Sequence, residues 1–140
     1  MVIISHITEQ QFIKIFVSII TGKTTLPRKQ LYRHILFISF ILTIDPARKY
    51  TEKEFNGLLH LWLGLYGDHL GLDYVALRRY LVDERYIQRE ADGGNYQLLS
   101  KEPRFTYDRS IERLDLQELI NTASREKEQQ RQRYLHESKH

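Results

Sequence analysis

The sequence predicts a mainly α-helical fold with one small β-hairpin and with added helices at both ends. Two observations support this prediction. Apolar residues recur at helical spacing in several segments that open with capping residues, and the period changes between residues 86 and 98, where two short β-type runs flank Asp92-Gly93-Gly94. The chain has 140 residues, 41% of them hydrophobic and 28% charged, so it is long enough to bury a core without disulfides.

The first predicted helix opens with a capping box. Thr8 is the expected N-cap and Gln11 stands three residues later, with Ile7 and Phe12 placed to form a hydrophobic staple. Gly22 marks the end of the helix. Its apolar face consists of Phe12, Ile15, Phe16, Ile19 and Ile20.

The second predicted helix covers residues 27–44 and is the expected centre of the core. Pro27 suits a first helical turn, and the following residues are apolar on most sides of a helix, which is typical of a buried one. Asp45-Pro46 ends it.

Two further helices are predicted in the middle of the chain. The third covers 51–66, with Thr51 and Glu54 as a second capping box and a fraying end at the glycines 64 and 67. On this helix Asn56 is expected to fix a helix pair by a side-chain bond. The fourth covers 74–84 with Asp73 as N-cap.

The predicted hairpin spans residues 86–98, and an irregular stretch follows Pro103. A last helix is expected to start at Asp115, with Glu118 three residues on. Residues 124–140 are almost wholly polar and are expected to project into solvent or fray. This pattern divides the chain into an N-terminal extension (1–25), a central domain (26–100) and a helical, partly flexible C-terminal extension (101–140).

The order of three helices followed by a hairpin is that of a winged helix-turn-helix. In this arrangement helix 74–84 would read DNA and hairpin 86–98 would be the wing. The short fourth helix must be held against the two longer ones, which leaves one of its faces available to a partner. The same fold also serves as a protein-interaction module, so the fold alone does not fix the function.

Three blocks of the sequence resemble the bacterial DUF2087 family. They are residues 50–56 (YTEKEFN), residues 73–83 (DYVALRRYLVD), and Arg89 followed by residues 94–96 (GNY). The resemblance covers about residues 26–98 and implies a winged-helix-like domain of a transcriptional regulator. The family usually has glycine where this chain has Arg85, and glycine would suit a left-handed helix end at that position.

Four arginines are the candidate nucleic-acid-binding residues: Arg78, Arg79, Arg85 and Arg89. Arg78 and Arg79 are expected to point largely outward, and at least one of them is expected to contact phosphates or guanine edges in a major groove.

Two of these positions have structural alternatives. One of the adjacent arginines on helix 74–84 could instead pair with Asp73 or Asp83. Arg89 opens the wing, where it would either follow a backbone phosphate or pair with a polar neighbour across the hairpin. Tyr96 is expected to pack under the hairpin.

No enzyme signature is found, and no catalytic residue, metal site or cofactor is expected. The segment 21–24 (TGKT) ends like a P-loop, but Val17 stands where the pattern requires glycine and no strand precedes it. The chain has no cysteine, and His60 and His69, which lie near Asp68 in the sequence, are expected to be solvated surface residues and not metal ligands.

The charge is small and lies in the middle of the chain. Residues 23–104 hold thirteen basic and ten acidic residues, which accounts for the whole net charge of +3. No apolar stretch approaches the roughly 20 residues of a membrane-spanning helix, and the N-terminus does not resemble a signal peptide. A cytoplasmic protein without membrane contact is therefore expected.

Double-stranded DNA is the expected partner, with a protein partner bound through the same short helix as the alternative. The modest charge and the nine tyrosines support the alternative. The apolar face of the first helix must be buried somewhere. The sequence predicts a homodimer joined by the two terminal helices, the other possibility being a monomer in which both helices fold back onto helix 27–44.

Overall fold

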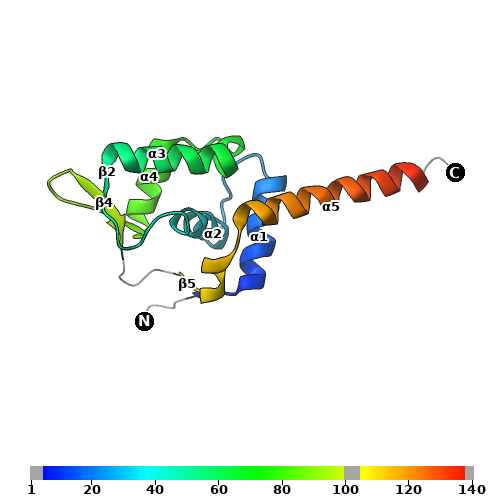
Figure 1. Ribbon diagram of the computed structural model, residues 1–140, viewed down its shortest axis with the longest axis horizontal. Coiled ribbons are helices and arrows are strands. Elements are labelled where there is room, and N and C mark those ends of the chain that lie inside the picture. Colours follow the sequence, from blue (N-terminus) through cyan, green and yellow to red (C-terminus); the bar gives the residue numbers. More distant parts are fainter. Residues whose placement is uncertain (1–4, 100–104, 138–140) are drawn as a thin grey trace.

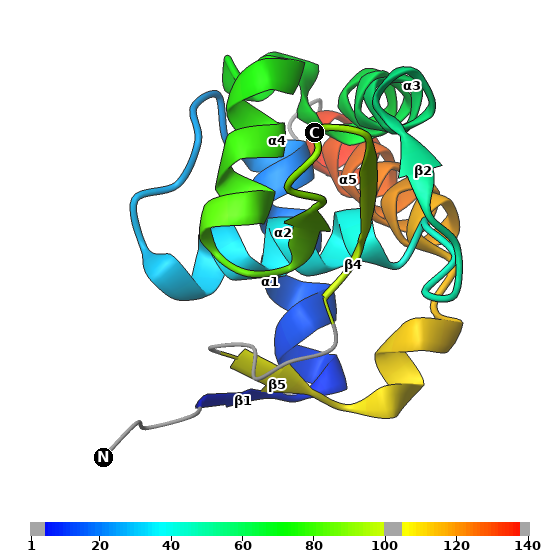
Figure 2. The same cartoon turned by 90° about the vertical axis from the view of Figure 1, so that its left-hand side faces the viewer.

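The computed structural model describes residues 5–99 and 105–137, which form a mainly helical structure with a small antiparallel sheet (Figures 1 and 2). This confirms the predicted fold class at the level of secondary structure. The elements in chain order are β1 (Ser5–Ile7), α1 (Glu9–Gly22), α2 (Gln30–Ile41), β2 (Tyr50–Thr51), α3 (Glu52–Trp62), α4 (Tyr74–Asp83), β3 (Ile87–Arg89), β4 (Asn95–Leu98), β5 (Phe105–Tyr107) and α5 (Leu116–Glu137).

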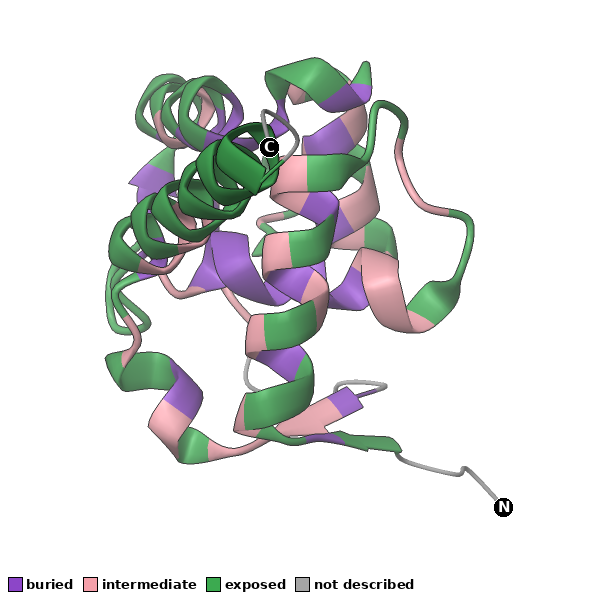
Figure 3. Cartoon of the chain, turned by 90° about the vertical axis from the view of Figure 1, so that its right-hand side faces the viewer, coloured by how far each residue is buried: buried purple, intermediate pink, exposed green. Residues whose placement is uncertain are grey.

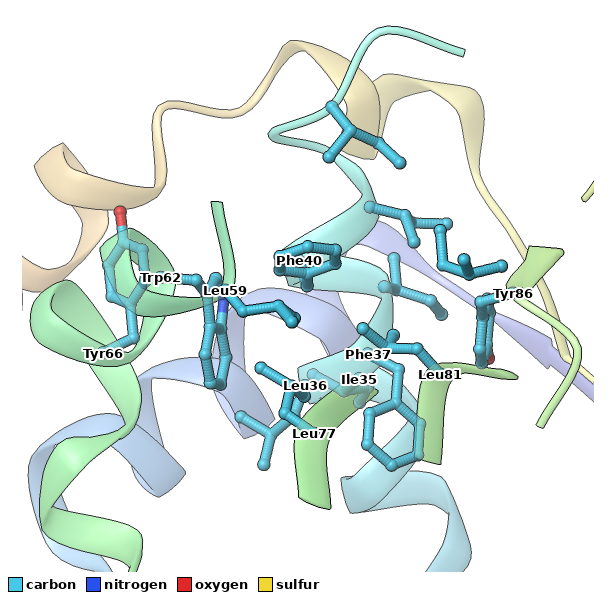
Figure 4. Packing of buried hydrophobic residues seen from close by; sticks show 14 of the residues in the cluster. Ile35, Leu36, Phe37, Phe40, Leu59, Trp62, Tyr66, Leu77, Leu81 and Tyr86 are labelled. Carbon is cyan, nitrogen blue, oxygen red and sulfur yellow. The ribbon is translucent and has the colours of Figure 1, made fainter. Parts of the chain in front are cut away.

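Helix α2 is the centre of the hydrophobic core, as predicted. Every residue from 34 to 41 is buried, so this stretch of helix has no side that faces solvent. Figure 4 shows Phe37 and Phe40 of α2 between Trp62 of α3 and Tyr86, which precedes the hairpin. The other helices are therefore held in place by the need to cover α2.

The polar side chains of α2 that are buried make hydrogen bonds. Ser39 accepts a hydrogen bond from the Trp62 indole at 3.0 Å. His34 Nδ1 lies 2.6 Å from the Tyr86 hydroxyl, and His34 Nε2 lies 3.3 Å from a carboxylate oxygen of Glu84. Burial raises the pKa of Tyr86 far above its ordinary value, so its hydroxyl stays protonated at neutral pH.

Helix α2 is shorter than the predicted 27–44. It begins at Gln30 after Lys29, and Pro27 lies before it, where its carbonyl accepts a hydrogen bond from the Arg33 side chain at 2.7 Å. At the other end the Thr43 amide bonds to the Phe40 carbonyl, so the chain tightens into a turn instead of continuing the helix.

Both predicted capping boxes are confirmed. The Thr8 hydroxyl accepts from the Gln11 amide at 3.1 Å, and Gln11 accepts from the Thr8 amide at 3.2 Å. The Thr51 hydroxyl accepts from the Glu54 amide at 3.2 Å, and Glu54 accepts from the Thr51 amide at 3.0 Å. The hydrogen bonds with Thr51 lower the pKa of Glu54, which therefore stays ionised at the positive end of α3.

The end of α3 differs from the prediction of a fraying end at Gly64 and Gly67. The chain continues as a π-helical turn over Leu63–Gly67 and a 3₁₀ turn over Asp68–Leu70. Gly67 is buried, and a Cβ atom there would lie 2.5 Å from the Trp62 ring. Glycine at this position thus lets the backbone close directly over the indole.

Helix α4 ends in a Schellman motif that contains Arg85. The Tyr86 amide bonds to the Leu81 carbonyl at 2.9 Å, and the Arg85 amide bonds to the Val82 carbonyl at 3.1 Å. Arg85 has a φ of 65°, the left-handed conformation that glycine would adopt more readily. At the other end of α4, Asp73 is the N-cap as predicted and accepts from the Ala76 amide at 2.7 Å.

The hairpin is confirmed and belongs to a three-stranded sheet in the order β2-β4-β3. Strand β3 pairs with one side of β4, and the short strand β2 pairs with the other, which was not predicted. Tyr96 of β4 lies opposite Tyr50 and stacks on Phe55 of α3 at 4.7 Å. The hairpin is thereby fixed to the start of α3, and Tyr96 packs under the hairpin as expected.

The two terminal segments meet in a parallel pair of strands, β1 and β5. The prediction of an irregular stretch is wrong for residues 105–113, which form β5 and a 3₁₀ turn, while Pro103 lies outside the described residues. His6 bonds to Thr106 at 2.8 Å and to Asp108 at 2.7 Å. The bonds from His6 and from the Glu9 amide lower the pKa of Asp108, which keeps this carboxylate ionised beside the start of α1.

Helix α5 begins after Asp115, which caps it through the Glu118 amide at 3.1 Å, as predicted. Its first turns pack against α1, which in turn packs on α2. The helix then continues away from the body of the molecule through Glu137, with its outer part exposed (Figures 1 and 3). Within the described ranges, no helix is both long and apolar enough to cross a bilayer.

Substitution of the α3 cap tests the role of Thr51. We expect Thr51→Ala to lower the free energy of unfolding by about 1 kcal/mol, because the Glu54 amide loses its acceptor. Chemical denaturation measures the change, and Thr25→Ala, at an exposed position before α2, is the control. Equal stability of the two variants would contradict the assignment of the cap.

The backbone conformation of Arg85 makes a second prediction. Arg85→Gly should raise the free energy of unfolding by about 1 kcal/mol, because the left-handed conformation costs glycine less than arginine. Arg85→Ala is the matched control, since it removes the charge but keeps the Cβ atom. A gain in stability from alanine as large as that from glycine would show that the charge, and not the backbone, is responsible.

Candidate nucleic-acid interface

The outward face of α4 and the β3–β4 hairpin meet at a shallow hollow of about 290 Å³. In Figure 2 both elements face the viewer, and α4 leads directly into β3. Leu77 and Leu81 point into the core and hold α4 against α2, so the opposite side of α4 faces the hollow. The hollow is lined by Val75, Arg78, Arg79, Val82, Asp83, Arg89 and Tyr96.

Arg78 is half-buried and connects α4 to α3, which corrects the expectation that it points largely outward. Its guanidinium donates to the Asn56 side-chain oxygen at 2.8 Å and lies 3.3 Å from a carboxylate oxygen of Glu52. The expected role of Asn56 in fixing a helix pair is thus confirmed. The alternative partners predicted for the arginine, Asp73 and Asp83, are wrong in this case, because the bond crosses to α3.

Two tyrosine rings complete the surroundings of Arg78. Its guanidinium carbon lies 6.0 Å from the Tyr74 ring centre and 5.9 Å from that of Tyr96. With only 23% of its side chain exposed, Arg78 has little freedom to turn toward a ligand. Its geometry suits the positioning of α4 relative to α3 and the hairpin.

Arg79 is exposed on the side of α4 that lines the hollow. Among the described residues, no side-chain hydrogen bond or ion pair occupies its guanidinium. The whole donor set of this group is therefore available to an acceptor such as a phosphate or a base edge.

Arg89 is also exposed, at the end of β3. Its cross-strand neighbour is Tyr96, and the guanidinium carbon lies 5.8 Å from the centre of that ring. The predicted pairing with a polar neighbour is replaced by an aromatic contact, which orients the guanidinium but leaves its hydrogen-bond donors open.

Arg85 does not line the hollow. It is exposed at the left-handed turn that follows α4. The structure therefore brings Arg78, Arg79 and Arg89 together and leaves Arg85 at the margin, so these four arginines do not form one continuous patch.

The charges around the hollow are only partly balanced. Asp83 lines it, and Glu52 compensates Arg78, which leaves Arg79 and Arg89 as the cations that face outward. Beside the hairpin, Lys49 forms an ion pair with Glu90 at 2.7 Å, and this contact lowers the pKa of the Glu90 carboxyl.

Lys49 was not predicted to lie near the hairpin, because the pattern at Tyr50 and Thr51 predicts only the start of a helix. Strand β2 has only two residues, too few for a local pattern that would have predicted it.

The structure offers little support for sites of other kinds. Thr21, in the segment that ends like a P-loop, belongs to the end of α1 and bonds to the Val17 carbonyl at 2.7 Å. Across residues 5–99 and 105–137, no group of three or more potential metal ligands is found.

Comparison with known proteins identifies one family. A family model described as an uncharacterized protein conserved in bacteria (DUF2087) matches residues 24–98. No curated protein and no solved structure matches the chain. The match includes α2, α3, α4 and the hairpin, and therefore every residue of the hollow. Because it covers more than half of the sequence, the chain belongs to the DUF2087 family.

Proposed function

We propose that this protein is a winged-helix DNA-binding protein that regulates transcription in the cytoplasm. Helix α4 is the reading helix and the β3–β4 hairpin is the wing. The observation that carries the proposal is the convergence of Arg79 and Arg89 on one hollow between these two elements, both exposed and both without an acidic partner in the described part of the chain.

The dimensions of α4 are compatible with entry into a major groove. Its 10 residues correspond to a length of about 15 Å, and the groove of B-DNA admits a helix. Arg79 would then reach a phosphate or a base edge from the helix, and Arg89 a phosphate from the wing. Val75, with 46% of its surface exposed near the start of α4, is placed to contact a thymine methyl group.

In this proposal the four arginines have different roles. Arg78 fixes the angle between α4 and α3, and Arg85 is available for a backbone contact at the edge of the site. Asp83 weakens the local field, so that moderate affinity with a clear dependence on salt is expected.

The alternative function is a protein-interaction module without nucleic-acid binding. Its support is the mixed character of the hollow, in which exposed Val75 and partly buried Val82 lie among the arginines. A partner with an acidic and apolar segment would suit such a surface. In either case no catalytic chemistry is proposed for the hollow.

The terminal helices are proposed to join two copies of the chain. Their packing in one chain already brings α1 and α5 together, and α1 also covers α2. The apolar face of α1 is therefore largely buried within the chain, and a dimer must use the remaining surface of α1 and α5.

Salt-dependent binding to random duplex DNA tests the proposed function. Each of Arg79→Ala and Arg89→Ala should weaken binding and lower the slope of log affinity against log salt by about one unit, because one phosphate contact is lost. Arg113→Ala, which removes an exposed arginine of the 3₁₀ turn before α5 that does not line the hollow, is the control. Unchanged affinity and slope in both folded variants would refute DNA binding at this hollow.

Arg78→Ala should act through stability. Loss of the charged hydrogen bond to Asn56 should lower the free energy of unfolding by about 1.5 kcal/mol, as measured by chemical denaturation. Arg79→Ala is the matched control, since it removes the neighbouring arginine without breaking a bond. If the two variants were equally stable, Arg78 would not be the link between α3 and α4.

A further inference from the structure

A small cavity of about 190 Å³ lies where the C-terminal end of α2 and the end of β4 meet β5 and the 3₁₀ turn that follows it. Five of its seven lining residues are aliphatic, so its walls favour a ligand with an apolar body. Pockets for drug-sized ligands begin at about 300 Å³, and this cavity therefore suits a smaller molecule, with one ring or a short chain. The lining residues are Ile41, Leu42, Ile44, Pro46, Leu98, Tyr107 and Glu112.

The two polar side chains of the cavity are neighbours. The Tyr107 hydroxyl donates to a carboxylate oxygen of Glu112 at 3.4 Å. Burial raises the pKa of Tyr107, and the charge of Glu112 raises it further, so the hydroxyl stays protonated at neutral pH. The pair therefore carries the single negative charge of Glu112. This carboxylate keeps unused acceptor sites next to apolar walls.

The charge of Glu112 is not balanced within the cavity. No basic residue lines it, and across residues 5–99 and 105–137 Glu112 forms no ion pair and bonds only to Tyr107. One wall is the C-terminal end of α2, where the helix dipole is negative, and the last turn of α2 contains no basic residue. Both features disfavour a phosphate or a carboxylate in the cavity and favour a cation.

We propose that this cavity binds a small primary amine with an apolar ring or chain. Its ammonium group would donate to Glu112 and to the Tyr107 oxygen, which can accept a hydrogen bond while its own hydrogen is donated. The apolar part would lie against Leu42, Ile44 and Leu98. A metal ion fits less well, because Ca²⁺ and Mg²⁺ require more oxygen ligands than one carboxylate and one hydroxyl supply.

A bound amine would join two parts of the chain. Leu98 ends β4, the central strand of the small sheet, whereas Tyr107 and Glu112 lie outside the residues that the family model matches. The ligand would therefore link the sheet to the segment before α5 and stabilise the folded chain. This proposal goes beyond DNA binding and does not rest on it. The cavity shares no lining residue with the hollow between α4 and the hairpin, so the two proposals can fail separately.

Three probes test the class of the ligand: 2-phenylethylamine, 2-phenylethanol and 3-phenylpropanoate. They place a positive, a neutral and a negative group on the same ring and two-carbon chain. Amide resonances of the ¹⁵N-labelled full chain would be followed without DNA. The amine should shift residues 41–44, 98 and 107–112 with a dissociation constant of about 1 mM, as expected for a ligand of this size. The alcohol should bind about tenfold more weakly, because it lacks the charged contact, and the acid should cause no shifts there.

Substitution of Glu112 tests the residue that selects the amine. Because Glu112 is exposed, Glu112→Gln should remain folded. It should weaken binding of the amine about tenfold and leave the alcohol unchanged, so that the two probes bind alike. Glu126→Gln, which removes an exposed carboxylate of α5 outside the cavity, is the matched control and should bind the amine like the wild-type chain.

Three results would each overturn the proposal. They are the absence of shifts at these residues with about 10 mM amine, binding of the acid as tightly as the amine, and an affinity for the amine that Glu112→Gln leaves unchanged. The comparison of the three probes uses the wild-type chain and is decisive whether or not the variant folds.

Discussion

The burial of α2 is the constraint on which the other elements depend. Eight consecutive residues, from His34 to Ile41, are excluded from solvent, so neighbours must cover the helix on every side. Helices α1, α3 and α4 and the residues that flank the hairpin supply those neighbours. Each of them contributes an apolar stripe to α2 and turns its polar side outward.

This arrangement explains why the candidate site lies where it does. Helix α4 is short and contributes Leu77 and Leu81 to the core, so most of its remaining surface faces outward. Tyr86 follows it immediately and anchors the start of the hairpin through its contact with His34. The outward side of α4 and the hairpin are therefore rigidly related, which is the property that a reading helix and a wing require.

The arginines of the site differ in what they touch, although the sequence places two of them side by side. Arg78 is held by Asn56, Glu52 and two tyrosine rings. Arg79, one position further along the helix, makes no such contacts with the residues that the structure describes. A rotation of about 100° per residue separates them, so one faces α3 and the other faces solvent.

Local signals in the sequence predicted much of the fold. Each of these signals depends on residues only a few positions apart, and each is present in the structure. They are the capping boxes at Thr8 and Thr51, the N-cap at Asp73 and the Asp-Gly-Gly turn of the hairpin. Strands β1 and β5 pair across about a hundred residues, and β2 has only two residues. None of these three strands therefore has a local signature in the sequence.

The same distinction applies to the site. Sequence spacing placed Arg79 and Arg89 on elements that meet, because the order of helix and hairpin determines that contact. It did not reveal that Arg78 is bound by Asn56, since that bond depends on how α3 and α4 cross. The glycine that the family usually has at position 85 left open whether arginine strains the left-handed turn or changes it, and in the structure Arg85 keeps the left-handed conformation.

The most direct test of the central claim is to map the proposed DNA-binding surface by NMR, without any substitution. Amide resonances of the ¹⁵N-labelled chain would be followed during titration with a random duplex at low salt. The largest shifts should fall in residues 73–83 and 87–96, the proposed reading helix and wing. Shifts confined to α1 and α5, or no shifts at all, would contradict it.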